Sequence, residues 1–265
     1  MINLSAEFLK IKTYSTHEAF KLWKNSAGEN SYDILAKYSF KRSGSLVDLG
    51  SGRSELLSYI RKNFAGKYTG IDQSQREIDI ANTIDDNHAE FICSSTESIP
   101  LASETASTAI SHMFFHMLID PKPTIKETAR ILKNGGELIF LIRNPSPPSG
   151  VHSEIAKYIR SEIESTRPDL FKIFLQHRPM NEERVSNIFK VSFSTVETKN
   201  IELHRFITPE EGFNMWNGMF PLTQLTEKEK RPIAQKILNI LDKKSDINGQ
   251  INYSTYFSLY RLKKL

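Results

Sequence analysis

The sequence is poor in cysteine: Cys93 is the only one in 265 residues. A single cysteine excludes an internal disulfide and leaves no set of thiolates for a structural zinc site. Because Cys93 closes an apolar run typical of a strand, we expect it to be a small core residue, with a reactive thiol as the alternative.

Long apolar runs are also missing. No stretch of about 18 apolar residues occurs anywhere in the chain. Residues 1–12 do not carry a basic segment followed by an apolar one, which is the pattern of a secretory leader. We therefore expect a cytoplasmic protein without a membrane segment.

Neither sign of charge dominates, since 35 Lys and Arg face 31 Asp and Glu for a formal net charge of +4. Part of the excess lies in Arg261, Lys263 and Lys264 at the end of the chain. A surplus this small and dispersed argues against a nucleic-acid partner. The 39% hydrophobic and 25% charged residues are ordinary for a globular protein. The length favours one large domain with an added cap over two small domains.

Residues 46–54 read Leu-Val-Asp-Leu-Gly-Ser-Gly-Arg-Ser and predict a buried strand, a glycine turn and the start of a helix over residues 55–65. A second apolar strand ends at Asp72, about 20 residues beyond the glycines, where a ribose would present its hydroxyls. Glycine lets a ligand approach the main chain closely. The two stretches together predict a nucleoside site, with helix capping as the alternative role of Asp72.

Two carboxylates narrow the choice of nucleoside. In a dinucleotide fingerprint, G-x-G-x-x-G, the third glycine would stand at Glu55, and Asp48 lies two residues before Gly50. Both acids would repel a pyrophosphate held nearby. An acid at the end of the first strand suits a ligand that carries an ammonium and a sulfonium without a phosphate. We interpret the site as one for S-adenosylmethionine.

Several stretches in order resemble the class I S-adenosylmethionine-dependent methyltransferases, in particular their small-molecule, methyltransferase type 11-like branch. They correspond to motif I, the acidic loop, the adenine loop, the loop after strand four and the R-x-L-K-x-G-G hairpin. The matching stretches are residues 46–53, 70–72, 90–100, 109–116 and 129–140. The resemblance implies an α/β fold: a doubly wound, Rossmann-like seven-stranded sheet, mostly parallel with an antiparallel last strand, and helical cap insertions.

The same resemblance implies one methyltransferase domain over residues 1–265. Its expected parts are an N-terminal helical segment (1–45), a cofactor-binding core (46–144), cap and substrate-binding insertions around strand six (145–250) and a C-terminal strand (251–265). The local patterns predict two helices within residues 15–40 with a break at 27–30, and further helices over 121–133, 152–164, 168–176, 181–190, 208–219 and 226–241. They predict late strands over 196–206 and 252–261.

S-adenosylmethionine, with S-adenosylhomocysteine as product, is the cofactor that the resemblance implies. Its expected contacts are Asp48, Gly50, Ser51, Gly52, Asp72, Gln73, Ser95, Thr96, Ser111 and His112. Ser54 departs from the family pattern by replacing the glycine that often closes motif I. Ser95 departs from it by replacing the aspartate that accepts from the adenine amino group. We therefore expect adenine recognition to depend on backbone groups around Thr96, with modest cofactor affinity.

The acceptor side is predicted from histidine and aromatic residues. His116 is the candidate general base, needed only where the acceptor must lose a proton, and a pocket-lining histidine is the alternative. Tyr14, Phe115, Met215 and Trp216 are candidate substrate contacts, with core packing as the alternative for each. Aromatic and methionine side chains suit an apolar or planar acceptor. No metal is expected.

The sequence as a whole predicts a methyltransferase that acts on an oxygen, nitrogen or carbon atom of a small metabolite by in-line displacement. One alternative is an RNA or protein methyltransferase, although the chain lacks the N-P-P-Y or D-P-P-Y tetrapeptide of many amino-methylating relatives. Another alternative is a non-catalytic protein that binds S-adenosylmethionine. The acceptor and the oligomeric state are open at this point.

Overall fold

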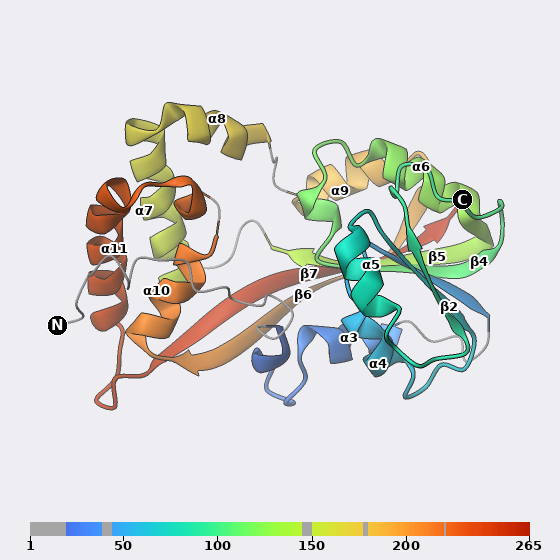
Figure 1. The fold of residues 1–265 in the computed structure, drawn as a ribbon, viewed down its shortest axis with the longest axis horizontal. Helices are drawn as coiled ribbons and strands as arrows, with labels where there is room; N and C mark the ends of the chain where they lie inside the picture. Colours follow the sequence, from blue (N-terminus) through green and yellow to red (C-terminus); the bar gives the residue numbers. More distant parts are fainter. Residues whose placement is uncertain (1–19, 39–43, 145–149, 177–179, 220) are drawn as a thin grey trace. The chain divides into compact units, whose positions relative to one another are not determined.

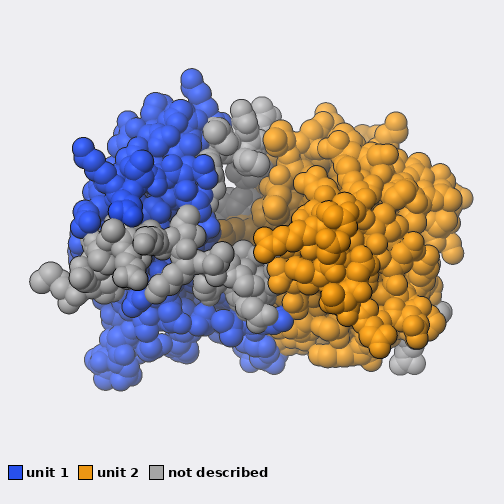
Figure 2. Space-filling model, viewed as in Figure 1, with its two compact units in different colours: residues 1–28, 147–177, 202–255 blue, residues 29–146, 178–201, 256–265 orange. Residues whose placement is uncertain are grey.

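The computed structural model describes residues 20–38, 44–144, 150–176, 180–219 and 221–265. The chain divides into two compact units, coloured separately in Figure 2. Unit 1 comprises residues 1–28, 147–177 and 202–255, and unit 2 comprises residues 29–146, 178–201 and 256–265. Each unit is therefore assembled from three separate segments of the chain.

A seven-stranded sheet runs in the order β3-β2-β1-β4-β5-β7-β6. The strands are β1 (Ser45–Leu49), β2 (Lys67–Asp72), β3 (Ala89–Cys93), β4 (Ala106–His112), β5 (Leu132–Arg143), β6 (Phe193–Ile207) and β7 (Ile251–Lys264). β1 to β5 pair in parallel, whereas β7 is antiparallel to β5. The predicted doubly wound sheet with an antiparallel last strand is confirmed. The strand order reverses at β1 and β4, which is where such sheets bind ligands.

Helices cover both faces of the sheet in unit 2. They are α3 (Ser31–Tyr38), α4 (Glu55–Ile60), α5 (Gln75–Ala81), the 3-10 turn η1 (Phe115–Met117), α6 (Lys122–Ile131) and α9 (Glu182–Phe189). Figure 1 shows α6 and α9 on one face and α3 and α4 on the other. Leu56, Leu57 and Ile60 of α4 are buried.

Aromatic rings fill the core between the sheet and α9. Phe140 on β5 stacks on Tyr260 of β7 at 5.0 Å and on Phe189 of α9 at 5.2 Å between ring centroids. Phe115 of η1 joins this group at 4.9 Å from Phe140. Aromatic pairs at these distances contribute beyond their buried area. The core of unit 2 thus combines rings from early, middle and late parts of the chain.

Unit 1 is mainly helical in its described part. It contains α7 (Val151–Thr166), α8 (Pro168–Gln176), α10 (Pro209–Asn217), the 3-10 turn η2 (Leu222–Gln224) and α11 (Glu227–Asp242). Thr208 and Thr226 each form a complete capping box with the glutamate three residues later. These boxes satisfy two backbone N–H groups at the start of α10 and of α11.

Three local predictions differ from the structure. The helix predicted to run to residue 65 ends at Ile60, because the Arg61 side chain donates to the carbonyls of Phe64 and Gly66 and fixes a turn. Residues 134–136 belong to β5 rather than closing α6, since Leu132 is already extended and pairs with Ala106. Cys93 is exposed, so its expected core position is wrong. It ends β3, the edge strand, whose side chains are exposed or only half-buried.

Candidate functional site

The parallel pairing of β1, β2 and β4 brings the residues that follow them to one edge of the sheet. Asp48 on β1 is level with Gly70 on β2 and with Ile110 on β4. Residues 50–54, 72–74 and 111–116 therefore leave the sheet side by side, and the loop after β3 begins at the same edge because β3 is parallel to β2. This edge collects the predicted cofactor residues in one part of unit 2.

The turn after β1 requires glycine for its backbone and for its space. Gly50 and Gly52 have φ values of +68° and +54°, which L side chains rarely adopt. A Cβ on Gly50 would lie 2.3 Å from the Phe114 ring. The N–H groups of Gly50 and Ser51 donate to the Ile71 carbonyl at 2.9 and 3.0 Å. The turn is thus tied to the end of β2.

The carboxylate of Asp72 is held by two backbone donors. Its Oδ2 accepts from Gly52 N–H at 2.8 Å, and its Oδ1 accepts from Ser74 N–H at 2.8 Å. Each carboxylate oxygen has a second lone pair, so Asp72 retains acceptors for two ribose hydroxyls. Gln73 is exposed beside it. The contact with Ser74 also means that Asp72 helps to fix the start of α5.

Ser74 and Glu77 at the start of α5 form part of a capping box. Ser74 Oγ accepts from Glu77 N–H at 3.4 Å, as expected of an N-cap residue. The Glu77 carboxylate pairs with the Arg53 guanidinium at 3.1 and 3.4 Å. Arg53 follows Gly52 directly, so this ion pair fastens the glycine turn to α5.

In the described part of the chain, no cationic group lowers the pKa of the buried Asp48 carboxyl. Its side chain is 2% exposed, and its Oδ2 accepts from the Tyr68 hydroxyl at 2.7 Å. Its Oδ1 has no hydrogen-bond partner in the described part of the chain. The pKa of Asp48 is raised to about 7, chiefly by burial; the hydrogen bond from Tyr68 lowers it and the nearby Asp72 raises it. The site thus holds a carboxyl that would gain from a cationic ligand.

Ser54 adopts the backbone conformation that explains the family's glycine. Its φ of 60° is left-handed, and it is the N-cap of α4. A Cβ on Gly70 would meet the Oγ atoms of Ser51 and Ser54 at 2.9 Å each. The two serines therefore pack against the bare Cα of Gly70, and the closing position of the turn accepts a serine at the cost of backbone strain.

Residues at the end of β4 connect this edge to α3. Ser111 is fully buried, and its hydroxyl donates to the Leu49 carbonyl at 2.9 Å. His112 Nε2 lies 2.9 Å from Ser31 Oγ, and its ring stacks on Tyr32 at 4.2 Å. His116 follows in η1 and is half-buried. Ser111 thus fastens β4 to β1, and His112 fastens the same edge to α3.

The side chains of the loop after β3 turn back onto the protein. Ser95 Oγ accepts from Glu97 N–H at 3.2 Å. Thr96 is 6% exposed, and its hydroxyl lies 2.9 Å from that of Thr124 on α6. The position that carries an aspartate in the family thus holds a hydroxyl already engaged with its own loop.

The predicted substrate contacts lie in different places. Phe115 is fully buried in the aromatic core of unit 2, which is the core-packing alternative. Met215 and Trp216 belong to α10 in unit 1, and Trp216 Nε1 donates to the Tyr253 hydroxyl at 3.0 Å. Tyr14 lies outside the described residues. Trp216 borders a cavity of about 70 Å³ inside unit 1, together with Ala156, Ile159, Arg160, Ile163, Phe171, Pro221 and Leu222.

Several residues of this edge were not predicted. Tyr68 pairs with Leu46, two residues before Asp48 and on the same face of the sheet, so its hydroxyl reaches the Asp48 carboxylate diagonally. Ser31 meets His112 across 81 positions of sequence, a contact without a local signal. Within the described residues no group of three or more His, Cys, Asp or Glu is arranged to bind a metal ion. In that same part of the chain, every helix is too short or too polar to cross a membrane.

Comparisons with known proteins agree with this geometry. A family model described as a methyltransferase domain matches residues 47–140. Malonyl-acyl-carrier-protein O-methyltransferase of Hahella chejuensis is 30% identical over 128 residues, covering 43% of this chain and 46% of that protein. Arsenite methyltransferase of Mus musculus is 30% identical over 111 residues, covering 36% of this chain and 29% of that protein. The chain thus spans less than half the length of these curated relatives.

The fold is shared with solved structures over nearly the whole chain. A protein of Bacillus halodurans, solved as a candidate methyltransferase, superposes with a TM-score of 0.62 at 15% identity. The match covers 88% of this chain and 98% of that one. At 15% identity this similarity shows a shared fold, whereas the chemistry depends on the residues of the site.

Proposed function

We propose that this chain is a class I S-adenosylmethionine-dependent methyltransferase, an enzyme that methylates a small-molecule acceptor. The observation that carries this proposal is the Asp72 carboxylate held against the N–H of Gly52 in a turn of two left-handed glycines. In this arrangement a ligand can approach the backbone of the turn closely, and the carboxylate beside it can accept hydrogen bonds from ribose hydroxyls. The methyltransferase domain match over residues 47–140 spans the same elements.

The residues present fit S-adenosylmethionine. The left-handed glycine turn brings the backbone at Gly52 next to the Asp72 carboxylate, and Asp72 offers acceptors for ribose hydroxyls. The buried Asp48, whose Oδ1 has no partner within the described residues, offers a negative charge to an ammonium or sulfonium. When bound, this cofactor supplies a sulfonium-linked methyl group that an acceptor takes by in-line displacement. We assign Asp48, Gly50, Ser51, Gly52, Asp72 and Gln73 to its binding.

The protein's own contribution is alignment and, for some acceptors, proton removal. Alignment and exclusion of water supply most of the acceleration in such a displacement. We propose His116, on the turn that follows β4, as the group that takes the acceptor's proton near neutral pH. An unchanged turnover of His116→Ala across a pH series would remove this role and leave the cofactor assignment standing.

The acceptor proposed is small and partly apolar. We base this class on the methionine and aromatic side chains of α10, Met215 and Trp216, which suit an apolar or planar acceptor. The relatives' names specify malonyl-acyl carrier protein and arsenite as the molecules that those proteins methylate. Their chemical diversity leaves the acceptor of this chain to be found by experiment.

Titration calorimetry with S-adenosylhomocysteine tests the cofactor assignment. We expect wild-type protein to bind, and Asp72→Ala to lose at least about tenfold in affinity, because the ribose would lose charge-assisted hydrogen bonds. Asp79→Ala, on the exposed side of α5, is the matched control that keeps wild-type affinity. Equal affinity of Asp72→Ala and wild type would overturn the assignment.

Incubation of protein and S-adenosylmethionine with a metabolite pool tests catalysis. Mass spectrometry should detect a metabolite that gains the mass of a methylene group, together with S-adenosylhomocysteine. Binding of the cofactor without any such gain would favour a non-catalytic binding protein instead.

A further inference from the structure

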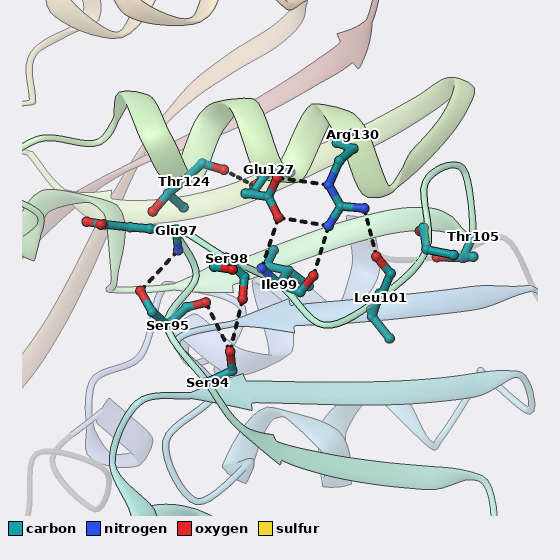
Figure 3. Close-up of polar contacts among 12 residues, drawn as sticks. Ser94, Ser95, Glu97, Ser98, Ile99, Leu101, Thr105, Thr124, Glu127 and Arg130 are labelled. Atoms are coloured by element: carbon teal, nitrogen blue, oxygen red, sulfur yellow. Dashed lines mark hydrogen bonds and ion pairs between the residues drawn. The ribbon is translucent and has the colours of Figure 1, made fainter.

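Two residues of α6, Glu127 and Arg130, hold the loop that follows β3. Arg130 donates from Nη1 to the Leu101 carbonyl at 2.7 Å and from Nη2 to the Ile99 carbonyl at 2.8 Å. Glu127 accepts from the Ile99 N–H at 2.9 Å. Figure 3 shows both side chains reaching from the helix to the loop. Ile99 is thus bound through both of its backbone polar groups.

Glu127 and Arg130 also bind each other, which fixes the direction of both side chains. Arg130 Nε and Nη2 each lie 2.8 Å from a Glu127 carboxylate oxygen. They are three positions apart on one helix and so share a face. Arg130 lowers the pKa of Glu127, chiefly through this hydrogen bond, so the pair is charged at neutral pH. We call these two residues the α6 clamp.

The clamp's effect on the loop exceeds that of an ordinary surface ion pair. Exposed ion pairs contribute little to stability by themselves. Here the planar guanidinium serves two loop carbonyls as well as a carboxylate, a geometry that a lysine cannot reproduce. The Ile99 side chain is 4% exposed and packs in the core, so the clamped residue is also a hydrophobic anchor.

Residues 94–98 are held between this anchor and the end of β3. Ser94 N–H donates to the Asp72 carbonyl at 2.9 Å, which ties the start of the segment to the ribose-binding residue. Within the segment, Ser94 Oγ donates to the Ser98 carbonyl at 3.1 Å and Ser98 N–H donates to the Ser95 carbonyl at 3.2 Å. Thr96 contacts Thr124 on α6. The segment is a compact turn with both ends fixed.

We propose that the α6 clamp positions residues 94–98 so that their backbone reads the nucleobase of the cofactor. The inference rests on the proposed function and names residues that act through the loop rather than on the ligand. The observation that prompts it concerns Ser95, whose hydroxyl accepts from the Glu97 N–H within its own loop. Where a side-chain carboxylate no longer selects adenine, selection passes to backbone groups, and their placement then depends on what holds the loop.

The test compares two ligands that differ only at the base, S-adenosylhomocysteine and S-inosylhomocysteine, by titration calorimetry. Wild-type protein should prefer the adenine ligand. Arg130→Met and Glu127→Ala should each reduce that preference by about tenfold, the size expected when a hydrogen bond involving a charged group is lost. Arg130→Lys should rescue it only in part, because lysine lacks the fork of donors.

The Glu137–Arg261 pair provides a matched control in the same unit. It is also bidentate, at 3.2 and 2.8 Å, and joins β5 to β7 away from the loop. Its side chains are 16% and 37% exposed, against 18% and 33% for Glu127 and Arg130. Arg261→Met should therefore lower the melting temperature much as Arg130→Met does, while it leaves the base preference at the wild-type value.

Hydrogen exchange of the ligand-free proteins provides a second readout that does not need the cofactor. Amides of residues 94–99 should exchange faster in Arg130→Met, and at the wild-type rate in Arg261→Met. Unchanged exchange in this segment, or a wild-type base preference in both clamp variants, would overturn the proposal. Failure of wild-type protein to bind either ligand would instead overturn the proposed function.

Discussion

Asp48 makes stability depend on pH in the sense opposite to that of most carboxyl groups. Burial raises its pKa from 3.8 to about 7 in the folded protein. Between these values the unfolded chain has released a proton that the folded protein keeps, so folding stability falls as pH rises from about 4 to about 7. The Asp48 carboxyl leaves the free energy of unfolding unchanged below this pH range and lowers it most above the range.

We therefore expect Asp48→Asn to be more stable than wild type at pH 8, by roughly 2–4 kcal/mol, and equal to it near pH 4. The amide keeps an acceptor for the Tyr68 hydroxyl and cannot ionise. Urea unfolding at a series of pH values measures the difference. Asp86→Asn is the contrasting variant: Arg61 lowers the pKa of Asp86, so its removal should destabilise at neutral pH and lose its effect in acid. A difference between Asp48→Asn and wild type that did not vary with pH would contradict the shift.

At the scale of single elements, two physical reasons for glycine, steric exclusion and a left-handed backbone, can be told apart by comparing Gly50 in the turn after β1 with Gly249. A Cβ on Gly50 would combine a φ of +68° with a 2.3 Å contact to the Phe114 ring. A Cβ on Gly249 would have a similar φ, +71°, and meet nothing within 4 Å. The pair of positions thus isolates steric exclusion from backbone strain.

Gly249→Ala should cost about 1 kcal/mol in the free energy of unfolding, which is the cost of a left-handed alanine. Gly50→Ala should cost at least about 2 kcal/mol more, because the aromatic ring has to move. Adding Phe114→Ala to Gly50→Ala should recover part of that excess. Chemical denaturation of the wild type, Gly50→Ala, Phe114→Ala and the double variant measures the coupling between the two positions. Equal costs at the two glycines would refute the steric account.

Elements with local signals were predicted well from the sequence. The helix over 168–176 was predicted at the bounds observed, and the helices that begin after Thr208 and Thr226 have local start signals within four consecutive residues. Features that depend on pairing between distant segments were not. The exposure of Cys93 follows from the place of β3 at the sheet edge, and the partner of Asp48 follows from the register of β1 against β2.

The candidate site divides in the same way. The strand ends and the glycine turn that gather Asp48, Gly52 and Asp72 could be predicted, because parallel strands of one sheet end at the same edge. The α6 clamp could not, because Glu127 and Arg130 are ordinary charged residues on an amphipathic helix until the loop after β3 is placed against them. A charge pair three positions apart is by itself no more than helix support.

At the scale of the whole molecule, the stretch that matches a methyltransferase domain, residues 47–140, supplies only part of the core of unit 2. The hydrophobic core of unit 2 includes Met180, Val185, Phe189, Phe193, Tyr260 and Leu262, all of which lie beyond residue 146. Without them β5 would lose its antiparallel partner β7 and the rings that stack on Phe140. The family-like core and the late segments therefore complete one another.

We expect the fragment 29–146 to lack a stable native state when expressed alone. It would expose the edge of β5, which in the full chain pairs with β7 over residues 137–143, and an uncovered apolar edge promotes aggregation. Far-UV circular dichroism and methyl NMR of the fragment should show weak cooperativity and poor dispersion, while residues 1–265 unfold cooperatively. The full chain contains α9, β6 and β7, which provide the apolar surface that the fragment lacks. Burial of such surface is the main force that stabilises a fold. A fragment that melted sharply and bound S-adenosylhomocysteine as tightly as the full chain would show that residues 147–265 serve the acceptor alone.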